Sequence, residues 1–239
     1  MAADPLELAE LLRYPSSSSG EHRASLFIVH GLGDSARGWA PPGRQLAAAF
    51  PGLHVILPTA PNQPVTINGG ARCPSWYDIY GLGADDKIDI EGLDAAAAAI
   101  VPLMEAEAEK VGWENVGLMG FSQGGVVTLH VMLSGKVPKI GAFIALSAYL
   151  PRSFDDHGIP SVDDSVAADS SLRTPLFHGH GDFDMVVKYE WGKATADLLT
   201  SLNLPLTFET YEGMGHSLCD LELVDIKAFV RKHLIRDDA

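Results

Sequence analysis

Residues 116–125 read Val-Gly-Leu-Met-Gly-Phe-Ser-Gln-Gly-Gly, and the mostly apolar run Val-Val-Thr-Leu-His-Val-Met-Leu follows them. The stretch contains Gly-x-Ser-x-Gly, a pentapeptide that forms a nucleophile elbow only when a strand enters it and a helix leaves it. Glycine lacks a Cβ atom, so the chain can turn sharply here and present the Ser122 hydroxyl. We therefore predict a strand, a turn and a helix with Ser122 as nucleophile. The alternative is a Gly-rich turn that carries a serine by chance.

A serine hydroxyl needs a base at neutral pH, and the base needs a carboxylate to orient it. Our candidate base is His216, which lies between a glycine loop and a closing helix; the alternative is a surface histidine at a helix N-terminus. Asp182 and Asp184 both follow an apolar run, and we favour Asp184, which opens Asp-Met-Val-Val. Asp182 directly follows Gly181 and is suited to bracing a turn. The chain order serine, aspartate, histidine is typical of α/β-hydrolases.

The tetrahedral intermediate of acyl transfer needs hydrogen-bond donors for its negative oxygen. One donor is the N–H of the residue after the nucleophile, here Gln123, and the other comes from a loop after an early strand. His-Gly-Leu-Gly-Asp at 30–34 follows the apolar run Leu-Phe-Ile-Val, so Leu32 is the predicted second donor. The alternative is an ordinary strand-to-helix turn. A phosphate loop is excluded, because the chain has no Gly-Lys-Ser/Thr.

Seven motifs in this order make the chain similar to the acyl-protein thioesterase / lysophospholipase / carboxylesterase family of small serine hydrolases. They are His-Gly-Leu-Gly-Asp at 30–34, Pro-x-Ala-Pro-x-x-Pro-Val-Thr at 58–66, Pro-Ser-Trp-Tyr-Asp at 74–78, Gly-Phe-Ser-Gln-Gly-Gly at 120–125, Ala-Leu-Ser-Ala-Tyr-Leu-Pro at 145–151, His-Gly-Asp-x-Asp at 180–184 and Tyr-Glu-Gly-Met-Gly-His-Ser at 211–217. The resemblance runs from about residue 24 to the C-terminus. It implies a triad of Ser122, Asp184 and His216, with Leu32 and Gln123 as oxyanion donors.

The chain departs from the family pattern around the expected acyl site. Lys188 follows Asp-Met-Val-Val where members often have a proline, and Tyr149 stands where many have tryptophan. A stretch that is often methionine-rich, in the family's lid loop, reads Asn-Gly-Gly-Ala-Arg-Cys at 68–73. The resemblance therefore implies hydrolase chemistry but leaves the acyl-chain preference open.

Three aromatic residues are candidates for the substrate site. Trp39 and Trp76 lie in predicted loops near the nucleophile and are candidates to wall the acyl groove; the alternative is packing within the loops. Tyr149 follows a predicted core strand. Ligands of open α/β sheets bind beyond the carboxyl ends of the strands, so Tyr149 is a candidate pocket wall.

Strand-like and helix-like segments alternate along the chain. Strands are predicted near 25–30, 53–57, 115–120, 140–146, 175–179 and 205–211, and helices near 41–50, 91–111, 123–134, 188–202 and 219–234. This alternation predicts a single α/β-hydrolase domain over 25–239, with a mostly parallel central sheet and helices on both faces. Residues 1–24 are predicted to be a flexible segment with a short helix near 5–12. Residues 58–80 are predicted to form a lid-like loop.

The composition limits the partners and the location of the protein. Of the 239 residues 46% are hydrophobic, and the net charge is −14, which argues against nucleic acid and anionic lipid as main partners. No secretory signal and no apolar run of membrane-spanning length is present, so we expect a cytoplasmic protein with at most transient membrane contact. The two cysteines fit no zinc spacing. We expect a monomer or a weak homodimer.

These observations predict a serine hydrolase that cleaves ester or thioester bonds through an acyl-enzyme and needs no metal or organic cofactor. By family resemblance the substrate is an acylated protein, a lysophospholipid or a small ester. One alternative is an esterase or deacetylase for short acyl groups. Another is a non-catalytic ligand-binding protein on the same fold, since fold alone does not define function.

Overall fold

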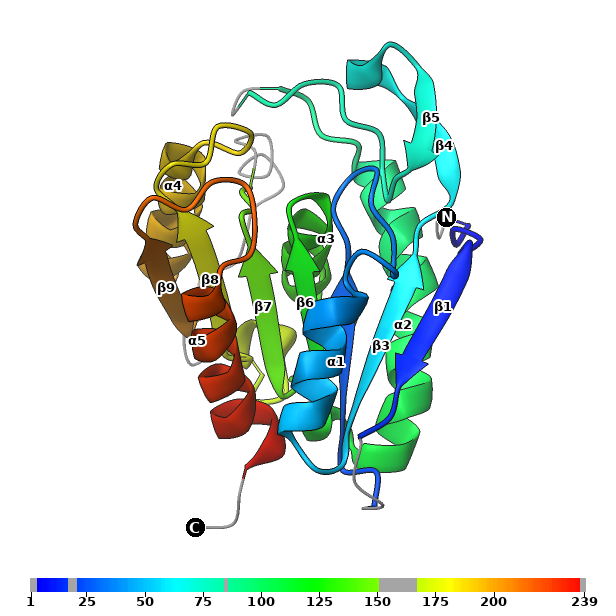
Figure 1. Cartoon of the computed structure of the whole chain (residues 1–239), viewed down its shortest axis with the longest axis vertical. Coiled ribbons are helices and arrows are strands. Elements are labelled where there is room, and N and C mark those ends of the chain that lie inside the picture. The colour runs from blue at the N-terminus through cyan, green and yellow to red at the C-terminus, as the bar shows by residue number, and fades with distance from the viewer. Residues whose placement is uncertain (1–3, 17–20, 84–85, 151–166, 237–239) are drawn as a thin grey trace.

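The central sheet has seven strands in the order β1-β3-β2-β6-β7-β8-β9 (Figure 1). The structure, a computed structural model, describes residues 4–16, 21–83, 86–150 and 167–236. The strands of this sheet are β1 (Glu10–Tyr14), β2 (Ala24–Val29), β3 (Leu53–Thr59), β6 (Val116–Phe121), β7 (Ala142–Leu146), β8 (Leu176–Gly181) and β9 (Leu206–Tyr211). β1 runs antiparallel to β3, and the other neighbouring strands are parallel. The predicted mostly parallel sheet is confirmed.

Helices cover both faces of this sheet. They are α1 (Ala40–Ala49), α2 (Ile90–Val111), α3 (Gln123–Leu133), α4 (Tyr189–Ser201) and α5 (Asp220–Val230), which continues into a π-helical turn over Arg231–Ile235. In Figure 1, α1 and α5 lie in front of the sheet, and α2, α3 and α4 lie behind it. Successive side chains of a strand point to opposite faces. Phe27 accordingly packs in the core with α2 and α3, and Leu26 and Ile28 pack in the core with α1 and α5.

Burial on both faces explains why the central strands consist mostly of apolar residues. All residues of β2 and β7 are buried. The six predicted strands and five predicted helices are confirmed, with ends that differ by at most two residues except where the last helix becomes π-helical. Among the described residues, no helix is long and apolar enough to cross a membrane.

The N-terminal segment differs from the prediction. The expected helix near 5–12 is wrong, because Glu10–Tyr14 forms the edge strand β1 and pairs with β3. Leu11 packs toward one core and Leu12 toward the other, so these five residues belong to the folded domain and not to a flexible segment. A strand this short shows little periodicity of its own, and hydrogen bonds from β3 decide its conformation. Residues 1–3 and 17–20 of the predicted flexible segment lie outside the described residues.

The predicted lid-like loop at 58–80 contains a β-hairpin. Strands β4 (Asn62–Val65) and β5 (Ala71–Pro74) pair antiparallel as a separate two-stranded sheet, joined through a 3-10 turn and Gly69-Gly70. Figure 1 shows this hairpin above the carboxyl ends of the main strands. Prolines occur in both strands, and proline is tolerated in a sheet chiefly at edges, which explains why the sequence pattern did not predict strands here.

Candidate active site

Ser122 lies on the turn between β6 and α3, with φ +53° and ψ −116°. A positive φ is uncommon for a residue with a Cβ atom and costs on the order of 1–3 kcal/mol. The surrounding backbone holds this conformation: Ser122 N–H donates to Leu146 O at 2.8 Å, and Val126 N–H donates to Ser122 O at 3.1 Å. The strand, turn and helix predicted around Ser122 are therefore present.

Close backbone contacts explain the two glycines that flank the serine. A Cβ atom on Gly120 would lie 2.0 Å from Gly124 O, and one on Gly124 would lie 2.1 Å from Val29 O. Neither glycine has a positive φ, which in this turn belongs to Ser122 itself. We expected the glycines to supply conformational freedom, but what they supply is space. Without them α3 could not begin directly against β2 and β6.

The structure brings together the three residues predicted as a triad. His216, in the loop between β9 and α5, places Nε2 3.0 Å from Ser122 Oγ. Its Nδ1 lies 2.7 Å from Oδ2 of Asp184, in the loop that follows β8. A carboxylate only accepts hydrogen bonds, so Nδ1 carries the proton and Nε2 can accept from the serine hydroxyl. The ring of Phe121 packs on the imidazole with centroids 4.8 Å apart.

Asp184 is held as an oriented carboxylate. It is 4% exposed, and its Oδ1 accepts the N–H groups of Val186 and Val187, each at 2.9 Å. Burial favours the neutral acid, but the hydrogen bonds from His216 and the two amides outweigh it and hold the pKa of Asp184 below its usual value. With Oδ1 bound to backbone, Oδ2 is fixed toward His216.

Asp182, the other candidate acid, lies in a different environment. Its Oδ1 accepts the Gly213 N–H at 2.6 Å, which joins the loop after β8 to the loop after β9. This is the turn-bracing contact that the sequence suggested for Asp182. Asp184 is therefore the aspartate that the structure places beside His216.

The loop after β2 passes directly beside Ser122. A Cβ atom on Gly31 would lie 3.4 Å from Ser122 Cβ. Buried His30 fixes this loop: its Nδ1 donates to Gly31 O at 2.7 Å, and its Nε2 accepts the Ala60 N–H at 3.1 Å. Burial lowers the pKa of His30, which keeps the ring neutral for both bonds. Leu32, the predicted second oxyanion donor, is the next residue after Gly31.

Gln123 contributes through its side chain as well as its backbone. As the first residue of α3, it has an N–H without a partner inside the helix. Its buried side-chain Oε1 accepts the Trp76 N–H at 3.0 Å, and Nε2 donates to Ser75 Oγ and Tyr77 O at 2.8 Å each. Sequence reasoning missed this clamp, although the motif at 74–78 marks the segment that it holds. The clamp fixes that segment against the nucleophile turn.

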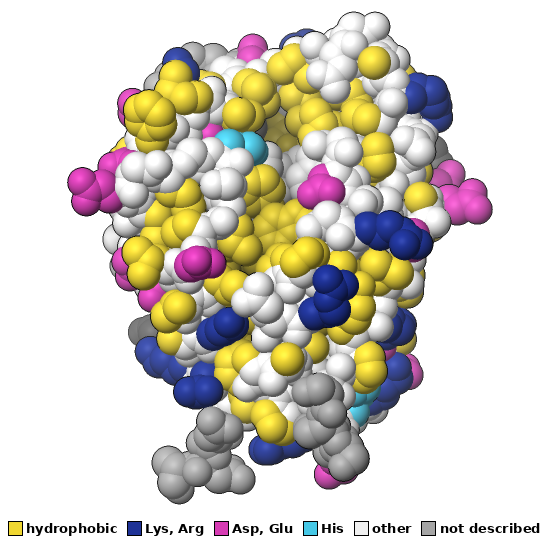
Figure 2. Space-filling model, viewed as in Figure 1, with side chains coloured by type: hydrophobic (Ala, Val, Ile, Leu, Met, Phe, Trp, Pro, Cys, Tyr) yellow, Lys and Arg dark blue, Asp and Glu magenta, His cyan; other side chains and the backbone are white. Residues whose placement is uncertain are grey.

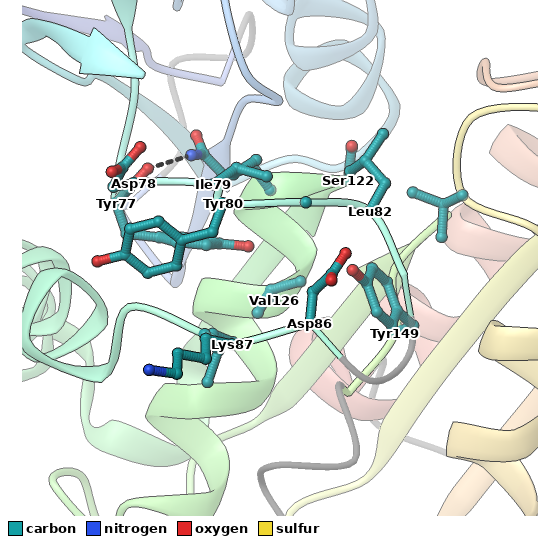
Figure 3. A pocket seen from close by; sticks show the side chains of 14 residues that line it. Tyr77, Asp78, Ile79, Tyr80, Leu82, Asp86, Lys87, Ser122, Val126 and Tyr149 are labelled. Atoms are coloured by element: carbon teal, nitrogen blue, oxygen red, sulfur yellow. Dashed lines mark hydrogen bonds between the residues drawn. The ribbon is translucent and has the colours of Figure 1, made fainter. Parts of the chain in front are cut away.

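A pocket opens beside Ser122. Besides Ser122 it is lined by Gln123, Val126, Tyr149 and Val187 and by residues 77–82 and 86–88. Figure 3 shows the Ser122, Val126, Asp86 and Tyr149 side chains around it. In Figure 2, hydrophobic side chains gather around a hollow near the upper ends of the central strands. Apolar side chains of this lining, such as Ile79, Leu82 and Val126, suit an acyl chain. The same lining also carries the charged side chains of Asp78, Asp86 and Lys87.

The three aromatic candidates take different places. Tyr149 lines the pocket, packs with its ring 5.3 Å from that of Trp191, and has its pKa raised to about 12 by burial. Trp76 has no exposed surface, and its indole N–H donates to His30 O at 2.9 Å, so it positions the loop that carries Leu32. The ring of Trp39 packs against that of Phe121, with centroids 5.3 Å apart. Neither tryptophan lines the pocket, because each is packed within the core.

No group of three or more His, Cys, Asp or Glu side chains that could hold a metal ion occurs in the ranges that the structure describes.

Comparison with known proteins agrees with this geometry. The family model described as phospholipase/carboxylesterase matches residues 16–234. An acyl-protein thioesterase 1 from Cryptococcus neoformans is 36% identical over 230 residues, which cover 89% of this chain and 93% of the relative. The crystal structure of acyl-protein thioesterase 2 from Zea mays aligns with TM-score 0.81 and 26% identity, over 94% of this chain and 99% of the other. The crystal structure of SOBER1 from Arabidopsis thaliana aligns with TM-score 0.78 and 29% identity, over 89% of this chain and 99% of SOBER1.

The family model covers more than half of the chain, and the sequence relative covers most of both proteins. The strand order, the turn at Ser122 and the placing of His216 and Asp184 are consistent with that match. The chain belongs to the phospholipase/carboxylesterase family, a family of serine hydrolases.

Proposed function

We propose that this protein hydrolyses acyl thioesters and esters through a covalent intermediate on Ser122. The observation that carries the proposal is the continuous hydrogen-bonded chain from Ser122 Oγ through His216 to Asp184. His216 Nε2 takes the hydroxyl proton as Oγ attacks the acyl carbon. Asp184 keeps the proton on Nδ1 and stabilises the imidazolium that forms.

Two backbone amides bind the oxygen that becomes negative. We assign this role to Gln123, at the start of α3, and to Leu32, in the loop beside Ser122. Donors at fixed positions stabilise the tetrahedral intermediate without reorganisation, and loss of one costs about 2.7–4 kcal/mol in related systems. The contacts of His30 and Trp76 support this assignment, because both hold His30, two residues before Leu32, in place.

The intermediate collapses when His216 returns its proton to the leaving thiolate or alkoxide. The acyl group then remains as an ester on Ser122 Oγ. A water molecule, activated by His216 in the same way, attacks that ester, releases the carboxylic acid and restores the serine hydroxyl. The same residues serve thioesters and oxygen esters, because the acyl-enzyme is identical for both.

The substrate class follows from the pocket and the relatives. Apolar side chains next to Ser122, among them Ile79, Leu82 and Val126, suit an aliphatic acyl chain. Relatives are named acyl-protein thioesterases, so we propose S-acylated proteins as the physiological substrates. In this proposal the acyl chain lies in the pocket, and the substrate protein, which carries the leaving thiol, lies outside it.

Hydrolysis of p-nitrophenyl esters from acetyl to palmitoyl, together with an S-palmitoylated peptide, tests the proposal. We expect Ser122→Ala to lower kcat by about 10⁴-fold or more on every substrate that the wild type cleaves. Ser201→Ala, which changes an exposed serine on α4, is the matched control and should behave as wild type. Absence of serine-dependent hydrolysis at any chain length, with folded protein, would refute the proposal.

A further inference from the structure

Glu222, in the first turn of α5, is a buried carboxyl that the proposed reaction does not use. Its exposed fraction is 0%. Neither carboxyl oxygen has a hydrogen-bond partner among the described residues. An ionised carboxyl in such a place is costly, so an unpartnered one calls for a physical explanation.

The carboxyl lies between the two chain segments that carry the base and its orienting acid. A Cβ atom on Gly179 of β8 would lie only 2.2 Å from Glu222 Oε1, so the missing side chain at that position makes room for the carboxyl. β8 leads directly into the loop that carries Asp184. α5 begins directly after the loop that carries His216. Contact between Glu222 and Gly179 therefore holds the first turn of α5, which follows the His216 loop, against β8, which precedes the Asp184 loop.

Helix capping does not account for this side chain. Cys219 and Glu222 have the spacing of a capping box, and Cys219 Sγ accepts the Glu222 N–H at 3.4 Å. A capping carboxylate would be ionised and stabilised by the helix N-terminus. Here burial, followed by the charge of Asp225, raises the pKa of Glu222 to about 8. The Cys219 N–H lies near the carboxyl but outside hydrogen-bonding geometry, so it lowers the pKa only in part. At neutral pH the neutral acid therefore predominates.

The groups that face Glu222 offer it no positive charge. The titratable ones are Asp225 on α5, Cys219 at the N-cap of that helix and Tyr211 on β9, and β8 presents Gly179. Tyr211 donates its hydroxyl proton to Asp225 Oδ2 at 2.9 Å, which leaves Asp225 as a negative neighbour. Deprotonation of Glu222 would thus place an uncompensated charge inside the contact between α5 and β8.

We propose that Glu222 is a positioning residue for His216 that acts in its protonated form. Its neutral carboxyl fills the space over Gly179 and holds the first turn of α5 against β8. This keeps the imidazole of His216 within hydrogen-bond distance of the Asp184 carboxylate. A charge in this space, or an empty space, lets the helix start move and lengthens the 2.7 Å bond between His216 and Asp184. The inference rests on the proposed function, because its effect on rate passes through His216.

Rate profiles from about pH 6 to about pH 10 test the inference with p-nitrophenyl butyrate as substrate. In the wild type we expect kcat to fall on the alkaline side as Glu222 ionises. Glu222→Gln, a neutral isostere, should keep the neutral-pH kcat within about threefold and lose that alkaline fall. Glu222→Ala should lower kcat by about tenfold or more with a smaller change in KM, as expected for a misplaced catalytic group. Glu212→Gln changes an exposed carboxyl and should match the wild type.

Three kinetic results would overturn the inference. They are the same alkaline fall in Glu222→Gln as in the wild type, an unchanged kcat in Glu222→Ala, and an activity of Glu222→Gln as low as that of the alanine variant. The last result would show that the acid function itself, and not the neutral shape, is required.

Melting temperatures supply a readout that does not depend on activity. The unfolded chain releases the Glu222 proton near the usual value of 4.5, whereas the folded chain keeps it to about 8. Wild-type stability should therefore fall relative to Glu222→Gln as pH rises from about 5 to about 8. A difference that does not vary with pH would mean that Glu222 is ionised, which would overturn the inference. If Ser122→Ala were fully active, the proposed function would fail, and the melting comparison would still decide the state of Glu222.

Discussion

Each end of the central sheet holds a serine, a histidine and a buried carboxylate within hydrogen-bond distance, but the order of the bonds differs. At the carboxyl end the histidine is in the middle: His216 contacts Ser122 Oγ at 3.0 Å and Asp184 at 2.7 Å. Its two ring nitrogens therefore connect the hydroxyl to the carboxylate. Ser122 lines a pocket, so a substrate can reach it.

At the amino end the serine is in the middle. Buried Ser25 donates to Glu107 Oε2 at 3.0 Å, and His22 Nε2 lies 2.8 Å from the same hydroxyl oxygen. Arg13 and Lys110 donate to the other oxygen of Glu107, at 2.7 and 2.9 Å. Burial opposes the charge, but the bonds from Lys110, Arg13 and Ser25 lower the pKa of Glu107 to about 2.

The comparison shows that residue types alone do not make a catalytic site. Ser25 is fully buried, so it cannot meet a substrate, and its hydroxyl donates its hydrogen bond to the carboxylate and not to His22. Arg13 and Lys110 neutralise Glu107, whereas Asp184 is bound by the imidazole that takes the Ser122 proton in the proposed reaction. The amino-end cluster therefore stabilises the fold, and the carboxyl-end cluster supports the proposed chemistry.

The largest expected effect is a loss of activity on substitution of Asp184, the carboxylate at the carboxyl end of the sheet. Asp184→Asn keeps an oxygen for the Val186 and Val187 amides but presents an amide to His216, which favours the wrong tautomer. We expect kcat to fall by about 10⁴-fold. Circular dichroism should show an unchanged fold. An activity within about tenfold of wild type would show that Asp184 does not orient the base.

The converse variant, Glu107→Gln, should act on stability and not on rate. It leaves Arg13 and Lys110 without their charged partner. We expect a loss of about 2 kcal/mol in the free energy of unfolding by urea, below the 3–5 kcal/mol of fully buried pairs because both cations are about half exposed. The kcat at neutral pH should stay within about twofold. A large loss of kcat with unchanged stability would contradict the division between the two ends.

Acid should remove the contribution of Glu107. Its pKa is lowered in the folded chain, so the stabilisation is complete above the ordinary value of 4.5 and is lost as pH falls toward about 2. The difference in urea midpoint between wild type and Glu107→Gln should therefore shrink when pH is lowered from about 6 to about 3. A constant difference over this range would mean that the Glu107 charge does not stabilise the fold.

The smallest effect is expected for the buried serine of the amino-end cluster. Ser25→Ala removes the hydrogen bonds to Glu107 and His22 and should cost about 1 kcal/mol of stability. Hydrolysis should be unchanged, which the ester assay measures directly. A loss of activity comparable to that of Ser122→Ala would mean that Ser25 takes part in the reaction.

The parts of the fold with long apolar segments could be predicted from the sequence. The β6–α3 unit shows an apolar run on each side of a glycine motif, and both elements form where expected. Short edge strands could not be predicted in the same way. β1 takes its conformation from hydrogen bonds to β3, and β4 contains a proline in a strand of four residues. For such segments tertiary contacts outweigh local preference.

The candidate site also has one part that could be predicted from the sequence and one part that could not. Ser122, Asp184 and His216 each follow a strand of a parallel sheet, and the carboxyl ends of such strands meet at one edge, so their approach could be predicted. The supporting contacts could not. The clamp of Gln123 on residues 75–77 and the bond from Trp76 to His30 join segments far apart in the chain. Their donors and acceptors become neighbours only after folding.

Covalent labelling with a fluorophosphonate probe tests the central claim most directly, with the adduct mapped by peptide mass spectrometry. The account predicts one adduct per chain, on Ser122, with labelling strongly reduced in Asp184→Asn and unchanged in Ser25→Ala. No labelling of folded wild-type protein, or equal labelling of wild type and Ser122→Ala, would contradict it.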